Sequence, residues 1–152
     1  MNFQSGVVED LETKMKNMKK DDFLNYVVKK LNEVHHYSWV GIYLVEGNEL
    51  ILKTFSGPRE TEHKIIPVGR GICGLAAEVG KTVVVQDVSK DNRYISCFPS
   101  TKSEIVVPIV KNGKVIGEID VDSDYLNAFT EEDKNFLEEV AKMVERKLRE
   151  SN

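Results

Sequence analysis

One of the two cysteines lies in a polar segment, "YISCFPSTK", which comes just before the apolar run "EIVVPI". A structural cysteine usually lies inside an apolar run, where its side chain packs as a small hydrophobe. Cys97 lies outside such a run, seven positions before Glu104. This position suits a nucleophile on a mobile loop, and it also suits an incidental surface thiol.

The other cysteine, Cys73, follows two glycines in "GRGICG", near the start of a predicted short helix that ends at Gly80. The N–H groups at a helix start can stabilise a thiolate, so a reactive thiol is one interpretation. The alternative is a small buried residue that packs a glycine-rich turn. Two-thiol chemistry needs an attacking and a resolving cysteine, and the chain has one candidate for each.

Carboxylates alternate along "GEIDVDS", so a strand there directs Glu118, Asp120 and Asp122 to one face. Glu104 begins the preceding predicted strand, and a hairpin turn at 112–113 brings it near the end that carries the two aspartates. A converging acidic cluster can bind an ammonium group or hold a proton at a raised pKa. Alternatively, the aspartates are solvated or cap a turn.

Two aromatic residues, Trp39 and Tyr43, are four positions apart in "WVGIY" and therefore share one face of a predicted strand. Aromatic residues on a sheet usually belong to the core. If this face also bears the carboxylates, the two rings form the apolar wall of a pocket.

The terminal thirds of the chain have helical periodicity. Apolar residues predict N-terminal helices over about 5–36, the second of them capped by Asp21. A C-terminal helix is predicted over about 130–150, where Thr130 and Asp133 resemble a capping box. Each of these helices has one apolar face, so we expect them to pack together.

Between the helices, two hairpins and short strands over about 39–123 predict a largely antiparallel sheet that carries the pocket. With the terminal helices on one face of the sheet, the loops are left to cover the other face. The expectation is an α+β fold, organised as one domain over 1–152.

Composition narrows the functional classes. The net charge is −4, which leaves no basic excess for nucleic acid or an anionic membrane. No apolar run approaches the roughly 20 residues of a membrane span, and the N-terminus lacks a signal peptide, so we expect a cytoplasmic protein. In that reducing compartment the cysteines are expected to be thiols. Neither a metal site nor a cofactor is predicted, because the cysteines and histidines show no ligand spacing.

Several segments, taken in order, resemble a known family: "WVGIY", "GRGICGLA", "VVQDV", "YISC", "SEIVVPI" and "GEIDVDS". They are similar to the free methionine-(R)-sulfoxide reductases, which are stand-alone GAF domains, from about Trp39 through the final helix. The resemblance implies a GAF fold, with terminal helices on one face of a central sheet and a loop-covered pocket on the other. It also implies an antioxidant repair enzyme that converts free methionine (R)-sulfoxide to methionine.

The resemblance carries roles onto individual residues. It implies that Cys97 is the catalytic cysteine and Cys73 the glycine-loop cysteine. It implies that Trp39 and Tyr43 form an aromatic wall around the substrate methyl group. The implied substrate-binding carboxylates are Glu104, Asp120 and Asp122. In the implied mechanism the catalytic thiolate attacks the sulfoxide sulfur and becomes a sulfenic acid. A second thiol converts it to a disulfide, which thioredoxin or a similar dithiol reduces. We expect Glu104 to act as the acid while the aspartates hold the ammonium.

One position departs from the family pattern. The family commonly has a resolving cysteine ten positions before Cys73, where this chain has His63. Resolution then falls to Cys73 or to an external thiol. An alternative function also stays open, namely a non-catalytic GAF module that binds a small ligand or senses redox state through Cys73 and Cys97. A homodimer is one oligomeric state that the sequence leaves open.

Overall fold

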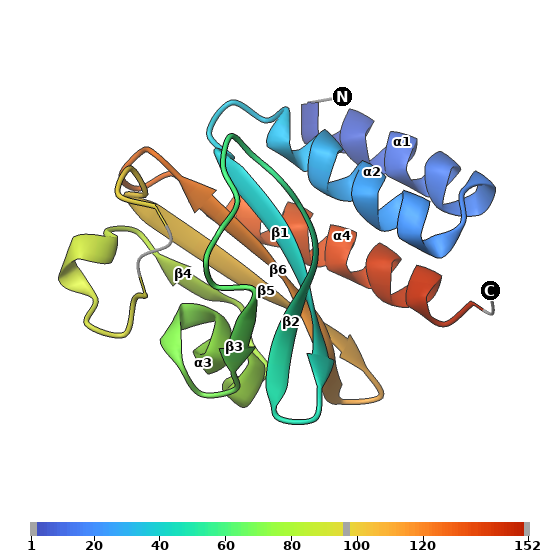
Figure 1. Ribbon diagram of the computed structural model, residues 1–152. Helices are drawn as coiled ribbons and strands as arrows, with labels where there is room; N and C mark the ends of the chain where they lie inside the picture. The colour runs from blue at the N-terminus through green and yellow to red at the C-terminus, as the bar shows by residue number, and fades with distance from the viewer. Residues whose placement is uncertain (1–2, 96–97, 151–152) are drawn as a thin grey trace.

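The computed structural model describes residues 3–95 and 98–150, and Cys97 therefore lies outside the described residues (Figure 1). In chain order, the helices and strands are α1 (Phe3–Asn17), α2 (Lys20–Asn32), β1 (Trp39–Glu46), β2 (Glu49–Ser56), β3 (Ile65–Pro67), α3 (Gly71–Val79), β4 (Val83–Val85), the 3₁₀ helix η1 (Val88–Lys90), β5 (Ser103–Lys111), β6 (Lys114–Ser123) and α4 (Glu131–Leu148).

Strands β1 to β6 form one sheet in the order β3-β2-β1-β6-β5-β4, and every neighbouring pair is antiparallel. The predicted turn between β5 and β6 is confirmed, with Asn112 and Gly113 both at positive φ (52° and 77°). Such angles suit the right-handed twist of a two-residue hairpin. Strand β4 is only three residues long, because the chain leaves the sheet after Val85 and then enters η1.

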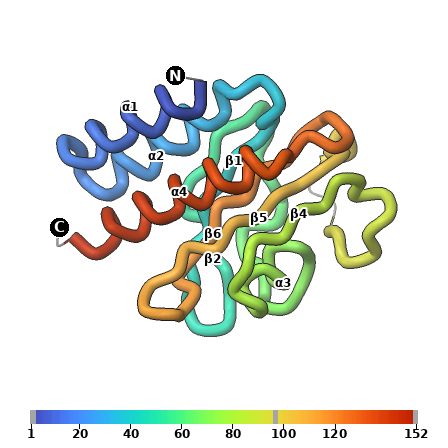
Figure 2. The backbone as a smooth tube through the Cα atoms, turned by 180° about the vertical axis from the view of Figure 1, so that it is seen from behind, coloured from blue at the N-terminus to red at the C-terminus, as the bar shows by residue number. Residues whose placement is uncertain are grey.

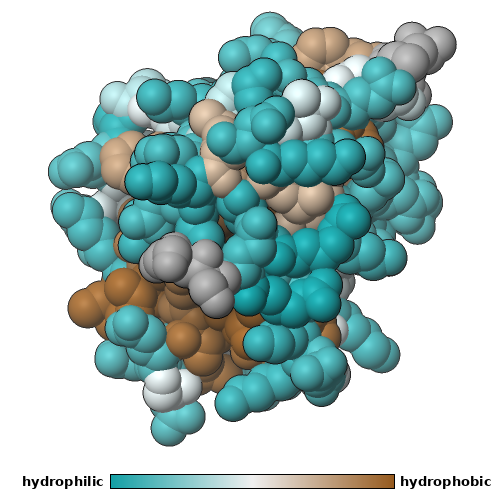
Figure 3. Space-filling view, turned by 90° about the vertical axis from the view of Figure 1, so that its right-hand side faces the viewer, coloured by the Kyte–Doolittle hydropathy of each residue, from teal (hydrophilic) through white to brown (hydrophobic). Residues whose placement is uncertain are grey.

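Helices α1, α2 and α4 pack together on one face of the sheet (Figures 1 and 2). The core between them takes every second residue of the central strands, including Val40 and Ile42 of β1 and Ile119 and Val121 of β6. The expected layer arrangement is thus confirmed. The side reached by the C-terminal end of α4 is mostly hydrophilic, with one apolar area low on it (Figure 3).

The helix starts show one success and one error of prediction. The capping box of α4 is confirmed: Thr130 Oγ1 accepts from the Asp133 N–H at 3.2 Å, and Asp133 Oδ2 accepts from the Thr130 N–H at 2.9 Å. The expected cap of α2 at Asp21 is wrong. Helix α2 begins at Lys20 after Lys19, so Asp21 lies within its first turn, where its charge still favours the helix dipole.

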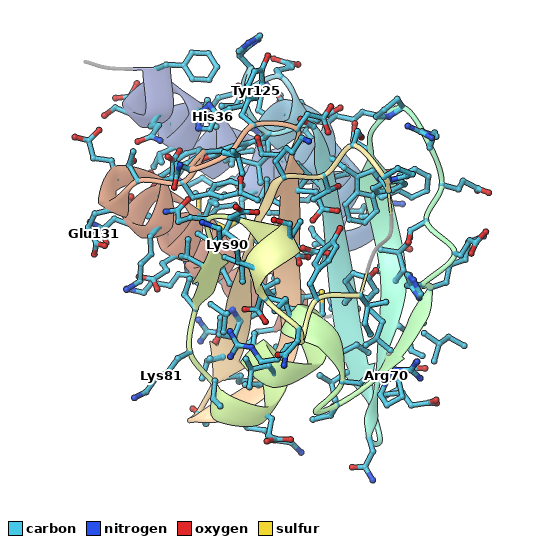
Figure 4. All side chains as sticks on the ribbon, turned by 90° about the vertical axis from the view of Figure 1, so that its left-hand side faces the viewer. His36, Arg70, Lys81, Lys90, Tyr125 and Glu131 are labelled. Atoms are coloured by element: carbon cyan, nitrogen blue, oxygen red, sulfur yellow. The ribbon has the colours of Figure 1, made fainter. Side chains whose placement is uncertain are left out.

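The opposite face of the sheet is covered by α3 and by the long connections around it. Figure 4 shows the left-hand side of Figure 1, where Lys90, at the end of η1, lies in front of the sheet and Lys81 follows α3. A second, smaller apolar cluster fills the space beneath, and it includes Trp39, Tyr43 and Cys73. Among the described residues, no helix is long and apolar enough to cross a membrane.

Candidate active site

Strand alternation brings the predicted site residues together on the face beneath α3. In the antiparallel register of β1 and β6, Trp39 lies opposite Asp122 and Tyr43 lies opposite Glu118. On the other side of β6, Glu104 of β5 also lies opposite Asp122. Residues from three adjacent strands therefore share one small area of the sheet. The expected convergence of the aromatic and acidic residues is what the structure contains.

The four carboxylates of this area are buried. The exposed fractions are 5% for Glu104, 0% for Glu118, and 1% each for Asp120 and Asp122. An isolated carboxylate is so costly to desolvate that it usually takes up a proton. Burial accordingly raises the pKa of Asp120, and burial together with the charge of Asp120 raises the pKa of Asp122 well above its ordinary range.

Glu104 links the two aspartates. Its side chain hydrogen-bonds both Asp120 and Asp122, and each of these bonds lowers the pKa of the aspartate against the larger effect of burial. A hydrogen bond between two carboxyl groups requires a proton on one of them. The three carboxyl groups therefore hold at least one proton between them.

Glu118 also belongs to the cluster. Its alternation with Asp120 along β6 predicts this position, but the family resemblance gives it no role. Burial, followed by the charge of Asp120, raises the pKa of Glu118 well above its ordinary range. The Cys73 thiol lies beside it, but a thiol is a weak donor. Neither carboxylate oxygen of Glu118 has a hydrogen-bond partner of ordinary geometry within the described residues.

Cys73 is the third residue of α3 and is buried against the carboxylates. Its sulfur, one oxygen of Glu104 and one oxygen of Asp120 all lie within 4.8 Å of one another. Burial, and then the charges of Asp120, Glu118 and Glu104, raise the pKa of the thiol well above its ordinary range. The thiolate stabilisation that a helix start could provide is therefore outweighed, and the resting thiol is protonated.

The indole of Trp39 forms the apolar side of the site. It stacks on Phe55 with ring centroids 5.8 Å apart and meets Phe98 at 5.7 Å. Its Nε1–H donates to the backbone carbonyl of Arg59 at 3.2 Å. A Cβ at Gly41 would overlap the indole, so a residue without a side chain is needed beneath it. The ring is held on several sides.

Tyr43 is fixed at the other end of β1's site face. It is completely buried, and its hydroxyl donates to the backbone carbonyl of His63 at 2.8 Å. The residue that replaces the family's resolving cysteine thus lies on the loop over Tyr43. Sequence reasoning placed the tyrosine in an aromatic wall, and the structure adds that its hydroxyl anchors the covering loop.

Two small cavities border the carboxylates, each of about 20 Å³. Cys73, Glu104, Asp120 and Ile95 contribute to the first. Each cavity has room for about one water molecule. An amino-acid ligand therefore needs the covering segments to move apart.

The second cavity lies at the Trp39 end of the site, where Asp122, Arg59 and Phe98 also line it. Ile95 and Phe98 are the described residues on either side of 96–97, and they line different cavities. Nothing in the sequence pattern singled out Ile95, Phe98 or Arg59, because they lie in irregular connections.

A larger groove, of about 670 Å³, runs along the outer side of α4 between residues such as Glu138 and Arg149. It lies on the helical side of the molecule, whereas the carboxylates lie on the opposite face of the sheet. The groove is open to solvent and is lined mainly by charged side chains. The candidate site is therefore the buried cluster.

Comparison with known proteins places this site in a family. Residues 20–148 match the model of the GAF domain. The chain is 44% identical to GAF domain-containing protein A of Dictyostelium discoideum over 120 residues, covering 78% of this chain and 75% of that protein. It is 42% identical to the free methionine-R-sulfoxide reductase of Saccharomyces cerevisiae over 111 residues, covering 70% of this chain and 61% of the yeast protein.

Among solved structures, the free methionine-R-sulfoxide reductase of Neisseria meningitidis in complex with its substrate superposes with a TM-score of 0.89. It is 37% identical to this chain, and the match covers 95% of this chain and 87% of that one. The sheet order, the helical layer and the sequence motifs lead to the same assignment. The chain belongs to the GAF domain family and, within it, to the free methionine-R-sulfoxide reductases.

Proposed function

We propose that this protein reduces free methionine (R)-sulfoxide to methionine through a cysteine sulfenic acid. The observation that carries the proposal is the buried acidic cluster beside an aromatic wall on one face of the sheet. A cluster of this kind can take up an ammonium group, and the aromatic wall can take up an apolar methyl group. The names of the relatives support the same substrate and the same overall reduction.

The acidic end holds the amino group of the substrate. Asp120 and Asp122 are the carboxylates that supply charge to the ammonium, which in turn favours their ionised forms and offsets the effect of burial. At the other end, Trp39 and Tyr43 enclose the methyl group. A substrate with a neutral amide in place of the ammonium leaves the buried charges uncompensated.

Glu104 supplies the proton that the reaction needs. A sulfoxide sulfur becomes electrophilic when its oxygen is protonated or strongly hydrogen-bonded. Glu104 hydrogen-bonds both aspartates, which requires a proton among the three carboxyl groups, and its side chain is only 5% exposed. A protonated carboxyl kept from water can serve as a general acid near neutral pH.

Cys97 is the nucleophile in this proposal. Ile95 and Phe98, the described residues that flank positions 96–97, line the two cavities at the carboxylates. The thiolate attacks the sulfoxide sulfur, and the S–O bond breaks as the protonated oxygen passes to the cysteine sulfur. The methionine sulfur gains two electrons and the cysteine sulfur loses two. The products are methionine and a sulfenic acid on Cys97.

Recycling requires a second thiol. When the Cys73 thiol attacks the sulfenic sulfur, a disulfide forms, and the sulfenic hydroxyl takes up the thiol proton and leaves as water. Thioredoxin or another dithiol then reduces the disulfide. Because Cys73 is buried and its pKa is raised, this step needs the site to open.

The experiment compares free methionine (R)-sulfoxide, its S epimer and N-acetyl-methionine (R)-sulfoxide, with dithiothreitol as reductant. Leaving a buried charge unpaired costs about 3 kcal/mol or more. We therefore expect kcat/KM for the N-acetyl compound to be at least about 100-fold lower than for the free amino acid. The S epimer should react poorly. Equal rates on free and acetylated substrates would contradict the proposed pocket, and no turnover would favour the binding module.

A separate measurement examines recycling. After one turnover with stoichiometric substrate and no added thiol, mass spectrometry should find a disulfide between Cys73 and Cys97. Cys73→Ser should then be recycled more slowly by thioredoxin. A persistent sulfenic acid in the wild type would show that Cys73 has only a packing role, and that an external thiol reduces Cys97 directly.

A further inference from the structure

We propose that the cluster of Cys73, Glu104 and Asp120 is a binding site for a thiophilic divalent cation such as Zn²⁺. The three side chains come from α3, β5 and β6, so their relative positions are set by the packing of α3 on the sheet. A cation bound there blocks the acidic end of the site. The blocking effect rests on the proposed function, whereas the binding itself does not.

The ligand atoms are near the spacing that a metal requires. The Cys73 sulfur, one oxygen of Glu104 and one oxygen of Asp120 all lie within 4.8 Å of one another. Zinc is bound by sulfur at about 2.3 Å and by carboxylate oxygen at about 2.0–2.2 Å. Side-chain rotations that draw the three atoms together by about one ångström complete such a site.

A second observation comes from polar atoms aimed into the same space. Asp120 is 1% exposed, it lines the cavity with Cys73 and Glu104, and its Oδ1 has no hydrogen-bond partner within the described residues. Glu118, completely buried, contributes two further oxygens without such partners beside the Cys73 thiol. The cavity volume of about 20 Å³ suits a single ion. Glu118 can thus provide the fourth ligand.

The donor set selects among cations. One thiolate with two or three carboxylates suits Zn²⁺ and its softer analogue Cd²⁺. Mg²⁺ and Ca²⁺ require more oxygen ligands and gain little from sulfur. The Cys73 proton must leave for the sulfur to bind, so cation binding releases at least one proton. Affinity should rise with pH by about tenfold per unit for each proton released.

The test titrates the reduced full-length protein with Cd²⁺ and follows the ultraviolet sulfur-to-cadmium charge-transfer band. We expect a saturating band at one equivalent, strengthening with pH, and resistant to millimolar Mg²⁺. Cys73→Ser should lose the band, and Cys97→Ser should keep it. A band that survives in Cys73→Ser, or that requires Cys97, overturns the site.

Two matched aspartate variants test the carboxylate ligand. Asp120→Asn should weaken Cd²⁺ binding by more than the roughly tenfold that a lost outer hydrogen bond costs a metal site. Asp124→Asn makes the same change at an exposed carboxylate near the end of β6 and should bind as the wild type. Circular dichroism confirms that each variant is folded. Equal affinity of the two variants, or no band in the wild type, refutes the proposal.

The effect on catalysis is read separately. Zn²⁺ should raise the apparent KM for free methionine (R)-sulfoxide without changing kcat, and EDTA should restore the original value. Binding without this competition would keep the metal site but separate it from the substrate pocket. Because the cadmium band needs no turnover, a failure of the proposed reductase activity leaves the binding result unaffected.

Discussion

Replacing Glu118 with glutamine should stabilise the protein at neutral pH and leave it unchanged at acidic pH. Glu118 is completely buried, and burial, followed by the charge of Asp120, raises its pKa well above the ordinary value. The folded protein therefore holds the proton more tightly than the unfolded chain does, so ionisation opposes folding. Glutamine has nearly the same shape and no charge to bury.

The sign and the size of the change in unfolding free energy caused by Glu118→Gln follow from proton linkage. Below about pH 4.3 the carboxyl of Glu118 is protonated in both the folded and the unfolded state, so it adds no pH dependence. Above that pH the unfolded chain loses the proton first. The free energy of unfolding of the wild type then falls, relative to the variant, by about 1.4 kcal/mol per pH unit until the folded pKa is reached. This corresponds to about 3–6 °C in Tm per pH unit for a chain of this size.

Thermal unfolding from about pH 4 to about pH 8 measures this difference. The Tm of Glu118→Gln minus that of the wild type should be near zero at the acidic end and grow with pH. Glu49→Gln, at an exposed position of β2, is the matched control and should show no such growth. A difference that does not depend on pH, or an advantage of the wild type at neutral pH, would refute the assigned ionisation.

Two further changes test the support of the site and of the helical layer. A methyl group in Gly41→Ala must displace the Trp39 indole. The KM for the proposed substrate should therefore rise by about tenfold or more, equal to about 1.4 kcal/mol of binding. The control Gly6→Ala, at an open position of α1, should not change KM. Asp133→Ala removes the acceptor of the buried Tyr37 hydroxyl at 2.6 Å and should lower stability by about 3 kcal/mol in urea unfolding, so a loss under about 1 kcal/mol would contradict this role.

Local rules were enough to predict much of the site. A period of two along "GEIDVDS" places three carboxylates on one face. The turn at 112–113 alone would pair Glu104 with Val121, and a register shift between Ile109 and Val110 pairs it with Asp122 instead. The same alternation pairs Trp39 with Tyr43. The alternations needed only strand geometry, which is a property of adjacent residues, whereas the register shift that brings Glu104 to the same face is not marked by the turn or by the period.

Other features depend on contacts between distant segments. The pairing of β1 with β6 brings Trp39 next to Asp122, and neither strand's own pattern specifies its partner. Cys73 shows most clearly what the local sequence cannot predict. The start of α3 favours a thiolate locally, yet packing beside Asp120 and Glu118 raises the thiol pKa instead. Ile95 and Phe98 reach the site from irregular segments, where no periodicity reports the direction of a side chain.

The central claim is that Cys97 transfers electrons to free methionine sulfoxide bound at the acidic cluster. A single-turnover reaction of the reduced protein with one equivalent of free methionine (R)-sulfoxide tests it most directly. Quantified methionine should reach one equivalent in the wild type and in Lys102→Ala, an exposed change on the same loop. Cys97→Ser should form none, even with excess dithiothreitol. Methionine formed by Cys97→Ser at the wild-type rate would contradict the account.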